Sequence, residues 1–242
     1  MDLPTHPHAG MRLALSETLT TAGVTRVCTI GHPDPQTREV LAQFAGWGGE
    51  LDILECACNA TVFPPASGAC AWIMPPVTNY YHAYRLLHGI RAICTKQEMP
   101  LLVVRPQLES AIARRDYYPG IPQVPPAWRH CSESCVMHGE ASERATVKGG
   151  LRNGVLTAIE DFTQELWDEG TALAYTCLPA IGGFCALFDV EADWSPKLAH
   201  NLSRFHDGAA VAAMSERELR EYLAIIERSR PNPSTRPDAA PQ

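Results

Sequence analysis

Four short, almost entirely apolar runs recur between helix-like segments in the first half of the chain. They lie at residues 26–30, 51–58, 69–74 and 101–104. Runs of this length with so few polar side chains are typical of strands that are covered on both faces. Strands of this kind, separated by helices, belong to βαβ units. The chain is therefore predicted to be an α/β protein with a mostly parallel sheet.

The segments between these runs carry apolar residues at helical spacing, and a hairpin pattern follows them. The predicted helices are residues 11–22, 37–44, 79–93 and 153–169. Residues 171–178 and 184–188 flank a proline- and glycine-containing turn, which predicts a C-terminal antiparallel hairpin. A capping box that starts at Ser215 opens one more helix. Residues 1–230 are predicted to form a single domain, and residues 231–242 a disordered tail.

The segment between the last apolar run and the helix at 153–169 has no sustained pattern. Residues 105–150 are interrupted by prolines and glycines and show neither helical nor strand periodicity. A patternless stretch of this length inside a compact domain usually has a function. It is predicted to be a long lid loop over a binding pocket.

Composition and charge exclude several classes of protein. The chain has 242 residues, of which 45% are hydrophobic, and a net charge of −7. These values are unlike those of a disordered chain, and they argue against nucleic acid as a partner. The longest uncharged stretch, residues 56–84, is broken by prolines, so no membrane span is expected. No signal peptide is visible at the N-terminus, and the chain is predicted to be cytoplasmic.

Five of the nine cysteines lie inside apolar runs. They are Cys28, Cys70, Cys94, Cys177 and Cys185. In a reducing compartment, cysteines in such surroundings behave as small hydrophobic residues. They are predicted to be buried thiols.

The part of the chain from Val24 to about Phe188 resembles one enzyme family, and particular segments carry the resemblance. They are residues 79–87, 114–118, 121–122, 126–129 and 149–162, with Leu178-Pro179 and Gly182-Gly183. These segments are similar to class I S-adenosylmethionine-dependent methyltransferases of the glycan and natural-product type, which carry an Asp-Gly-Asp-His signature. The resemblance implies a Rossmann-like fold, S-adenosylmethionine as cofactor, and a small natural-product or sugar-derived substrate. The substrate-binding residues expected within these segments are Asn79, Tyr80, Arg114, Arg115, Tyr117, Tyr118, Trp128, Arg129, Arg152 and Asn153.

The chain departs from this family at the expected cofactor site. A class I methyltransferase has a glycine-rich turn after its first strand, because a residue without Cβ lets the backbone approach the cofactor. The resemblance places that strand and turn within residues 1–10, where Pro4 stands at the expected glycine. The acidic residue expected after the second strand is represented only by Asp34. The S-adenosylmethionine site is therefore predicted to be degraded; the alternative is a register shifted by a few residues.

The metal motif of the family is also missing. Its Asp-Gly-Asp-His falls on residues 75–78, which read Pro-Pro-Val-Thr, and the next strand is followed by Arg105. No acidic residue occurs between Glu55 and Glu98. Because Mg²⁺ binds oxygen ligands, and carboxylates above all, a family-type metal site cannot be assembled from these positions.

Histidine and arginine stand near the positions that these acidic residues would occupy. His6 and His8 lie in the N-terminal segment, His32 follows the strand at 26–30, and Arg105 follows the strand at 101–104. The carboxyl ends of parallel strands meet at one edge of a sheet. We expect these four side chains to lie there as catalytic groups, for acid–base work or for binding an anion. The alternative is that the histidines are ordinary surface residues.

A second group of reactive side chains lies on the predicted lid. Cys131, Cys135 and His138 occur within eight residues and are candidate ligands for zinc, although Cys-x₃-Cys is not the usual zinc spacing. A thiol beside an imidazole also suits nucleophilic catalysis. The alternative is a loop that merely contains two cysteines. In the same segment, Asp116 is predicted to pin the lid to the body of the protein by pairing with arginine.

Three functions are compatible with these observations. The first is a methyltransferase-like enzyme of a biosynthetic pathway, repurposed to act on its small substrate without the standard cofactor and metal. The second is a non-catalytic pseudoenzyme that binds a biosynthetic partner protein. The third is an active S-adenosylmethionine-dependent O-methyltransferase with an atypical cofactor site. A homo-oligomer is compatible with each of them.

Overall fold

A six-stranded sheet forms the centre of the protein. The computed structural model describes residues 9–54, 70–94, 99–106, 114–119, 124–137, 140–178, 183–204 and 206. The strands of the sheet are β1 (Arg26–Ile30), β2 (Glu50–Leu54), β3 (Cys70–Val77), β4 (Leu101–Pro106), β8 (Leu173–Cys177) and β9 (Cys185–Asp189). Their order is β2-β1-β3-β4-β9-β8. The first four are parallel, and β9 is antiparallel to both of its neighbours. The predicted α/β class, the mostly parallel sheet and the C-terminal antiparallel hairpin are confirmed.

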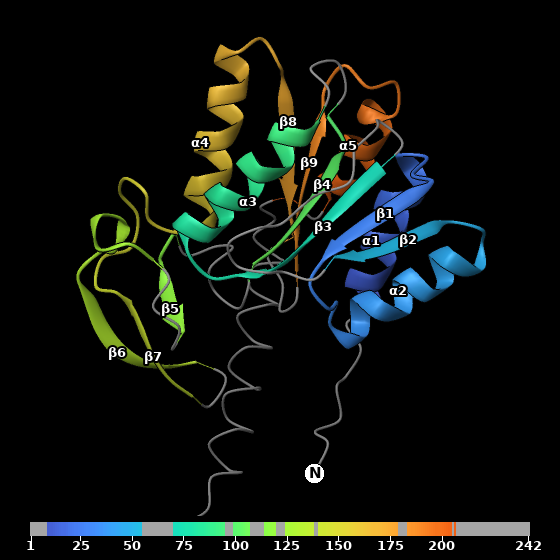
Figure 1. The fold of residues 1–242 in the computed structure, drawn as a ribbon. Coiled ribbons are helices and arrows are strands. Elements are labelled where there is room, and N and C mark those ends of the chain that lie inside the picture. The colour runs from blue at the N-terminus through green and yellow to red at the C-terminus, as the bar shows by residue number, and fades with distance from the viewer. Residues whose placement is uncertain are drawn as a thin grey trace, which may run out of the picture.

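Helices cover both faces of this sheet (Figure 1). They are α1 (Ala9–Thr21), α2 (Pro35–Gly46), α3 (Tyr80–Ile93), α4 (Val155–Asp168) and α5 (Ser195–Ser203). Alternate residues of β3 point to opposite layers: Trp72 packs in the cluster with α3 and α4, whereas Ile73 packs in the cluster with α1, α2 and α5. Because both faces of β1 and β9 and most of β3 are buried, these strands needed apolar residues at nearly every position. The four helices predicted within these ranges are confirmed to within a few residues.

The beginning of α3 shows how local sequence sets a helix boundary. Asn79 precedes the helix in an extended conformation, and its Oδ1 accepts a hydrogen bond from the His82 backbone N–H at 3.0 Å. This cap satisfies one of the first amides of the helix, which have no partner inside it. It fixes the first turn of α3 at the carboxyl end of β3.

The strand expected within residues 1–10 is not part of the described sheet. Ala9 and Gly10 already belong to α1, and residues 1–8 lie outside the described residues. β1 pairs with β2 on one side and with β3 on the other, so no position is left for a strand between them. The first strand of the sheet along the described chain is therefore β1, and the register inferred from the resemblance stays a prediction for residues 1–8.

The segment predicted as a patternless lid contains a second sheet. It consists of β5 (Tyr117–Pro119), β6 (Ser132–Met137) and β7 (Glu140–Ala145) in the order β5-β7-β6, with a short 3₁₀ helix, η1 (Pro126–Trp128). Most described residues of β6 are exposed, so neither face of that strand needs apolar residues. The alternation that reveals a half-buried strand was therefore absent. Figure 1 shows this small sheet beside the first turns of α3 and α4.

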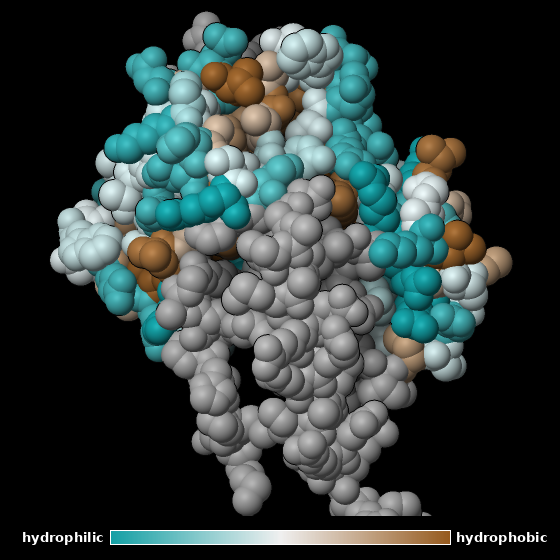
Figure 2. Space-filling model, turned by 180° about the vertical axis from the view of Figure 1, so that it is seen from behind, coloured by the Kyte–Doolittle hydropathy of each residue, from teal (hydrophilic) through white to brown (hydrophobic). Residues whose placement is uncertain are grey.

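Two features bear on the prediction that the chain has no membrane span: the helices and the surface of the described part. Among the described residues, no helix is both long and apolar enough to cross a bilayer. Figure 2 shows that, outside the grey atoms, hydrophobic side chains on this face are scattered among hydrophilic ones. Single exposed apolar residues of this kind are normal for a folded surface.

The helix predicted after Ser215 and the tail 231–242 lie outside the described residues.

Candidate functional site at the carboxyl edge of the sheet

A small pocket lies where the carboxyl ends of β1, β3 and β4 meet. After β1 the chain turns to one side to build β2, and it then crosses back to the other side to build β3. In an open α/β sheet, this reversal leaves a crevice in which ligands usually bind. The residues that line the pocket are Thr29, Ile30, Gly31, His32, Pro33, Asp34, Thr37, Ile73, Met74, Pro75, Pro76 and Arg105.

Gly31 makes the turn that carries the chain out of β1 and into the pocket. Its φ is +75°, a conformation that residues with a Cβ rarely adopt. Its backbone N–H donates to the Leu54 carbonyl at 2.7 Å, so the turn is held against the end of β2. A glycine with positive φ therefore follows β1 at the point where the strand order reverses.

Asp34 organises the charged side of the pocket. Its carboxylate accepts hydrogen bonds from the Thr37 backbone N–H at 3.2 Å and from the Thr37 hydroxyl at 2.6 Å, which caps α2. The same carboxylate forms an ion pair with Arg105, whose side chain is only 9% exposed. Burial lowers the pKa of Arg105 from its ordinary value, and the charge of Asp34 opposes that shift. The pair fixes the end of β4 to the start of α2.

The structure brings together two of the four side chains predicted for this edge. His32 and Arg105 both line the pocket, His32 with an exposed side chain and Arg105 with a buried one. His6 and His8 lie outside the described residues. Because Arg105 is paired with Asp34, the pocket carries charges of both signs. A catalytic role for these groups stays a prediction.

The side chains at this edge do not fit a divalent metal of the kind that the family uses. β3 places Pro75 and Pro76 at the pocket, and β4 places Arg105 there. Proline offers no side-chain ligand, and a guanidinium repels a cation. Asp34, the carboxylate in the lining, is already bound by Arg105 and Thr37. In the described part of the chain, no three histidine, cysteine or acidic residues gather as a metal site would require.

Asp116 connects the small sheet to α3 and α4, the two helices on one face of the central sheet. Its buried carboxylate accepts hydrogen bonds from the backbone N–H groups of Tyr80 at 2.6 Å and Gly154 at 2.8 Å, and from the Tyr118 hydroxyl at 3.2 Å. Tyr80 begins α3, and Gly154 precedes α4. Burial raises the pKa of Asp116, and these hydrogen bonds oppose that shift. Asp116 does pin the segment, but its partners are amides and a hydroxyl rather than the predicted arginine.

Three other residues predicted to bind substrate are buried in the same connection. The Asn153 Oδ1 accepts from the Asp116 N–H at 2.8 Å, and the Asn153 Nδ2 donates to the Val147 and Gly149 carbonyls. The Tyr117 N–H donates to the Thr78 carbonyl at 2.9 Å, beside Asn79. Asn79, Tyr117 and Asn153 are each 5% exposed or less. Their contacts hold the start of β5 against the segments that precede α3 and α4.

Three of the four predicted arginines have partners among the described residues. Arg114 forms an ion pair with Glu160 of α4. Arg129 pairs with Glu143 and lies over the Tyr118 ring at 4.8 Å. Arg152 lies over the Trp128 ring at 4.5 Å, and Trp128 in turn stacks on Tyr80. Arg115 is half-buried. Among the described residues from 114 to 150, none lines the pocket, so their role in substrate binding stays a prediction.

The proposed zinc ligands do not converge on the strand that carries them. Cys135 lies in β6, and Cys131 continues that strand, because its carbonyl accepts from the Thr146 N–H. An extended chain rises about 3.3 Å per residue, so the two Cα atoms lie about 13 Å apart. Zinc binds sulfur at about 2.3 Å, so this pair cannot share one ion in this conformation. His138 lies outside the described residues.

The prediction that the five cysteines in apolar runs are buried thiols holds for some of them only. Cys28 and Cys70 are buried thiols, as predicted, and Cys94 is partly buried. Cys177 and Cys185 are joined by a disulfide, so the prediction of free thiols was wrong for these two. They stand directly opposite each other on β8 and β9. The hairpin register brings their side chains together.

Comparisons with known proteins found no match: no family model, no curated protein and no solved structure is significantly similar to this chain.

The cap of α3 predicts a pH dependence of stability. Burial lowers the pKa of His82 from its ordinary value of 6.5, and the charge of Arg85 acts in the same direction. The His82 Nδ1 lies 3.2 Å from the Asn79 Nδ2, a contact that needs Nδ1 without a proton. The unfolded chain takes up this proton as the pH falls through about 6.5, before the folded chain does. Stability is therefore expected to fall from pH 7 downward until the pKa of the folded state is passed.

Replacing His82 tests this dependence. Between neutral and mildly acidic pH, the free energy of unfolding of His82→Gln should fall by about 1 kcal/mol less than that of the wild type. This difference is the value of one hydrogen bond. Urea unfolding at several pH values measures it. His200→Gln is the matched control, because His200 is exposed on α5. An unchanged pH profile in His82→Gln would show that His82 carries no such linkage.

Proposed function

We propose that this chain is a methyltransferase-like protein that binds an adenosyl ligand of the S-adenosylmethionine type in the pocket between β1 and β3, without a divalent metal. The observation that carries the proposal is the turn at Gly31, which has positive φ at the point where the strand order reverses. A parallel sheet closed by an antiparallel hairpin supports the family resemblance. With Gly31 in this position, Pro4 at the glycine position expected within residues 1–10 no longer argues against the cofactor.

A second sequence position supports the same ligand once β1 is taken as the first strand. In nucleotide-binding βαβ units, an acidic residue about 20 positions beyond the glycine turn binds the ribose hydroxyls. Glu55 directly follows β2 in the sequence and lies 24 positions after Gly31, outside the described residues. Gly31 would let the backbone approach the ligand, and Glu55 would accept its hydroxyls. The bound cofactor would supply an electrophilic methyl group.

The repurposed enzyme is the second candidate function, and one observation favours it. The Asp34–Arg105 pair and the cap of α2 already use the polar groups on one side of the pocket. A ligand on that side must either leave the pair in place or displace it. An unrelated small anion that pairs with Arg105 would use the same edge without an adenosyl group. The natural-product or sugar-derived substrate, a partner protein and a homo-oligomer stay predictions of the resemblance.

Calorimetric titration with S-adenosylhomocysteine and S-adenosylmethionine tests the proposal. We expect micromolar binding that does not change when a chelator is added. Glu55→Gln should weaken binding about tenfold, because a hydrogen bond to a charged group contributes about 1.5 kcal/mol or more. Glu50→Gln is the matched control, since Glu50 begins β2 at the opposite end of the strand.

Two results would contradict the proposal. Folded protein that binds neither ligand would exclude the adenosyl site and leave the repurposed function. Equal weakening by Glu50→Gln and Glu55→Gln would show that the carboxyl end of β2 has no special part in binding.

A further inference from the structure

The disulfide between Cys177 and Cys185 lies at a particular position in the β8–β9 hairpin. The Leu178 N–H donates to the Phe184 carbonyl at 2.9 Å, which makes residues 178 and 184 a hydrogen-bonded pair. The next pair, Cys177 and Cys185, is therefore a non-hydrogen-bonded pair, with Cα atoms 4.1 Å apart. In such pairs the side chains lie closest together across the ladder. The two sulfurs thus face each other at the carboxyl edge of the sheet.

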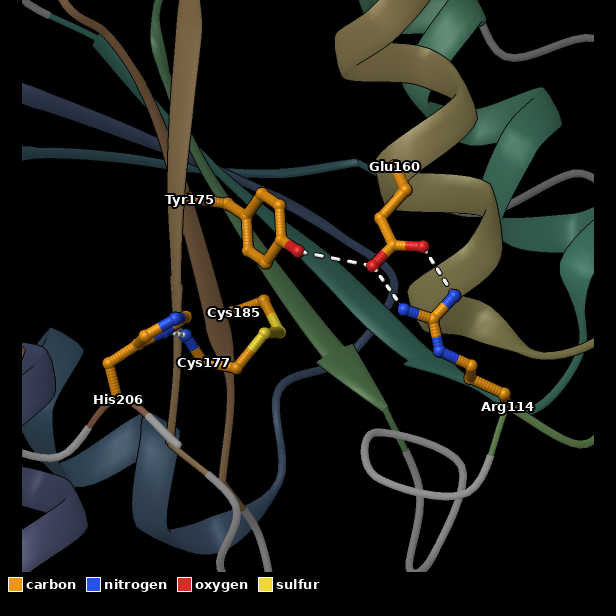
Figure 3. Close-up of a disulfide and its surroundings, with 6 residues drawn as sticks. All are labelled: Arg114, Glu160, Tyr175, Cys177, Cys185 and His206. Atoms are coloured by element: carbon orange, nitrogen blue, oxygen red, sulfur yellow. Dashed lines mark hydrogen bonds and ion pairs between the residues drawn. A yellow bond between two sulfur atoms is a disulfide. The ribbon is translucent and has the colours of Figure 1, made fainter. Parts of the chain in front are cut away.

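The two cysteine residues differ in exposure to solvent. Cys177 is half-buried, whereas Cys185 is 1% exposed and lies between β8 and β4, where it pairs with Val104. Figure 3 shows His206 on the Cys177 side of the disulfide, where its Nδ1 accepts the Cys177 N–H at 3.1 Å. Disulfide exchange needs direct access to a sulfur atom. Cys177, the more exposed of the two residues, is therefore the one that an incoming thiolate should attack.

The hairpin keeps the two residues together without the covalent bond. The ladder runs from Leu173–Asp189 to the cysteine pair and continues in the hydrogen bond of Leu178 to Phe184. The two cysteines are only eight positions apart, so the bond closes a short loop that the ladder already closes. Breaking the bond leaves both thiols in reach of each other. Reduction is therefore readily reversed.

We propose that Cys177 and Cys185 form a site of reversible thiol–disulfide exchange with a small thiol of the glutathione type. The thiolate attacks the Cys177 sulfur and forms a mixed disulfide, while the electron pair of the broken bond goes to Cys185, which takes a proton from solvent. A second thiolate attacks the outer sulfur of the mixed disulfide and releases Cys177 as a thiolate. In sum, the protein disulfide and two thiols become a protein dithiol and one small disulfide.

A second cysteine pair in the same sheet provides an internal comparison. The Sγ atoms of Cys28 and Cys70 lie 3.8 Å apart, but both residues are buried, and they stand on parallel strands at diagonal positions. Their mutual hydrogen bond and burial raise the pKa of Cys28. No small thiol can reach this pair in the folded protein. It should stay reduced under conditions in which Cys177 and Cys185 exchange.

Equilibration of the full chain in glutathione buffers tests the proposal. After trapping of free thiols by alkylation, mass spectrometry should show Cys177 and Cys185 passing together from mainly oxidised to mainly reduced as the buffer changes from glutathione disulfide to glutathione. Cys28 and Cys70 should stay unmodified throughout. A pair that stays fully oxidised in reduced glutathione while the protein is folded would be purely structural. A pair that never forms the bond in glutathione disulfide would equally overturn the proposal.

Single variants test which sulfur is attacked. In glutathione disulfide, Cys185→Ser should form a mixed disulfide at Cys177 at least about tenfold faster than Cys177→Ser forms one at Cys185, because reactivity follows exposure. Equal rates would contradict the assigned order of attack. Where a variant does not fold, the wild-type titration still decides whether exchange occurs. Cys131→Ser, which removes an exposed cysteine of the small sheet, should leave that titration unchanged.

Discussion

Asp116→Ala is expected to lower the free energy of unfolding by about 3–5 kcal/mol, because two buried backbone amides lose a charged acceptor worth about 1.5–3 kcal/mol each. Those amides, of Tyr80 and Gly154, stand at the starts of α3 and α4. Asp116 is fully buried, so water cannot readily replace its carboxylate. The loss should also loosen β5, since the Tyr118 hydroxyl donates to the same carboxylate. Urea unfolding followed by circular dichroism measures the change.

Two further variants separate the lost acceptor from other effects. Asp116→Asn keeps one oxygen acceptor at the same place and should cost less than Asp116→Ala. Asp193→Ala removes an exposed carboxylate and should stay within about 0.5 kcal/mol of the wild type, as surface substitutions usually do. If Asp116→Ala is as stable as Asp193→Ala, the two amides have found other acceptors and Asp116 does not connect the helices.

The central sheet and the helices around it could be predicted because their signal is local. Trp72 and Ile73 lie in opposite layers, so the whole of β3 had to be apolar, and the run stands out in the sequence. α5 was missed because it is short and its buried apolar residues are only Leu198 and Leu202. The small sheet was missed because β6 is exposed and has no apolar alternation.

The placement of the glycine turn could not be predicted in the same way. Which strand stands at the reversal point depends on the partners of β1, which are distant in sequence. A parallel pairing leaves no mark on the residues themselves, so the family resemblance decided the register and pointed to Pro4. In the structure, β1 stands at the reversal point and Gly31 follows it. The cofactor role proposed for Gly31 and Glu55 rests on taking β1 as the first strand of the family.

Within the candidate site, what could be predicted was position rather than partnership. His32 and Arg105 were expected at one edge because each follows a parallel strand, and both line the pocket. The pairing of Arg105 with Asp34 depends on side-chain geometry, which spacing does not reveal. The disulfide did have a signal: Cys177 and Cys185 are equidistant from the centre of the predicted turn, so a symmetric hairpin brings them together.

Gly154→Ala is expected to destabilise the protein by about 3 kcal/mol or more, the combined effect of backbone strain and overpacking. Gly154 has φ +92°, and a Cβ there would lie 2.4 Å from the backbone of Arg114 and Arg115. Backbone cannot yield as the end of a flexible side chain can. The variant should therefore push residue 114 away from α4 and weaken the ion pair of Arg114 with Glu160.

Gly23→Ala is the matched control for this effect. Gly23 also has positive φ, at +60°, but an added Cβ would meet no atom within 4 Å. Its cost should be that of the left-handed backbone alone, about 1 kcal/mol. Urea unfolding of both variants therefore measures the close approach of Arg114 as the difference between them. Equal destabilisation would mean that the small sheet moves away from α4 without penalty, and that its contact with the helix is not part of the rigid fold.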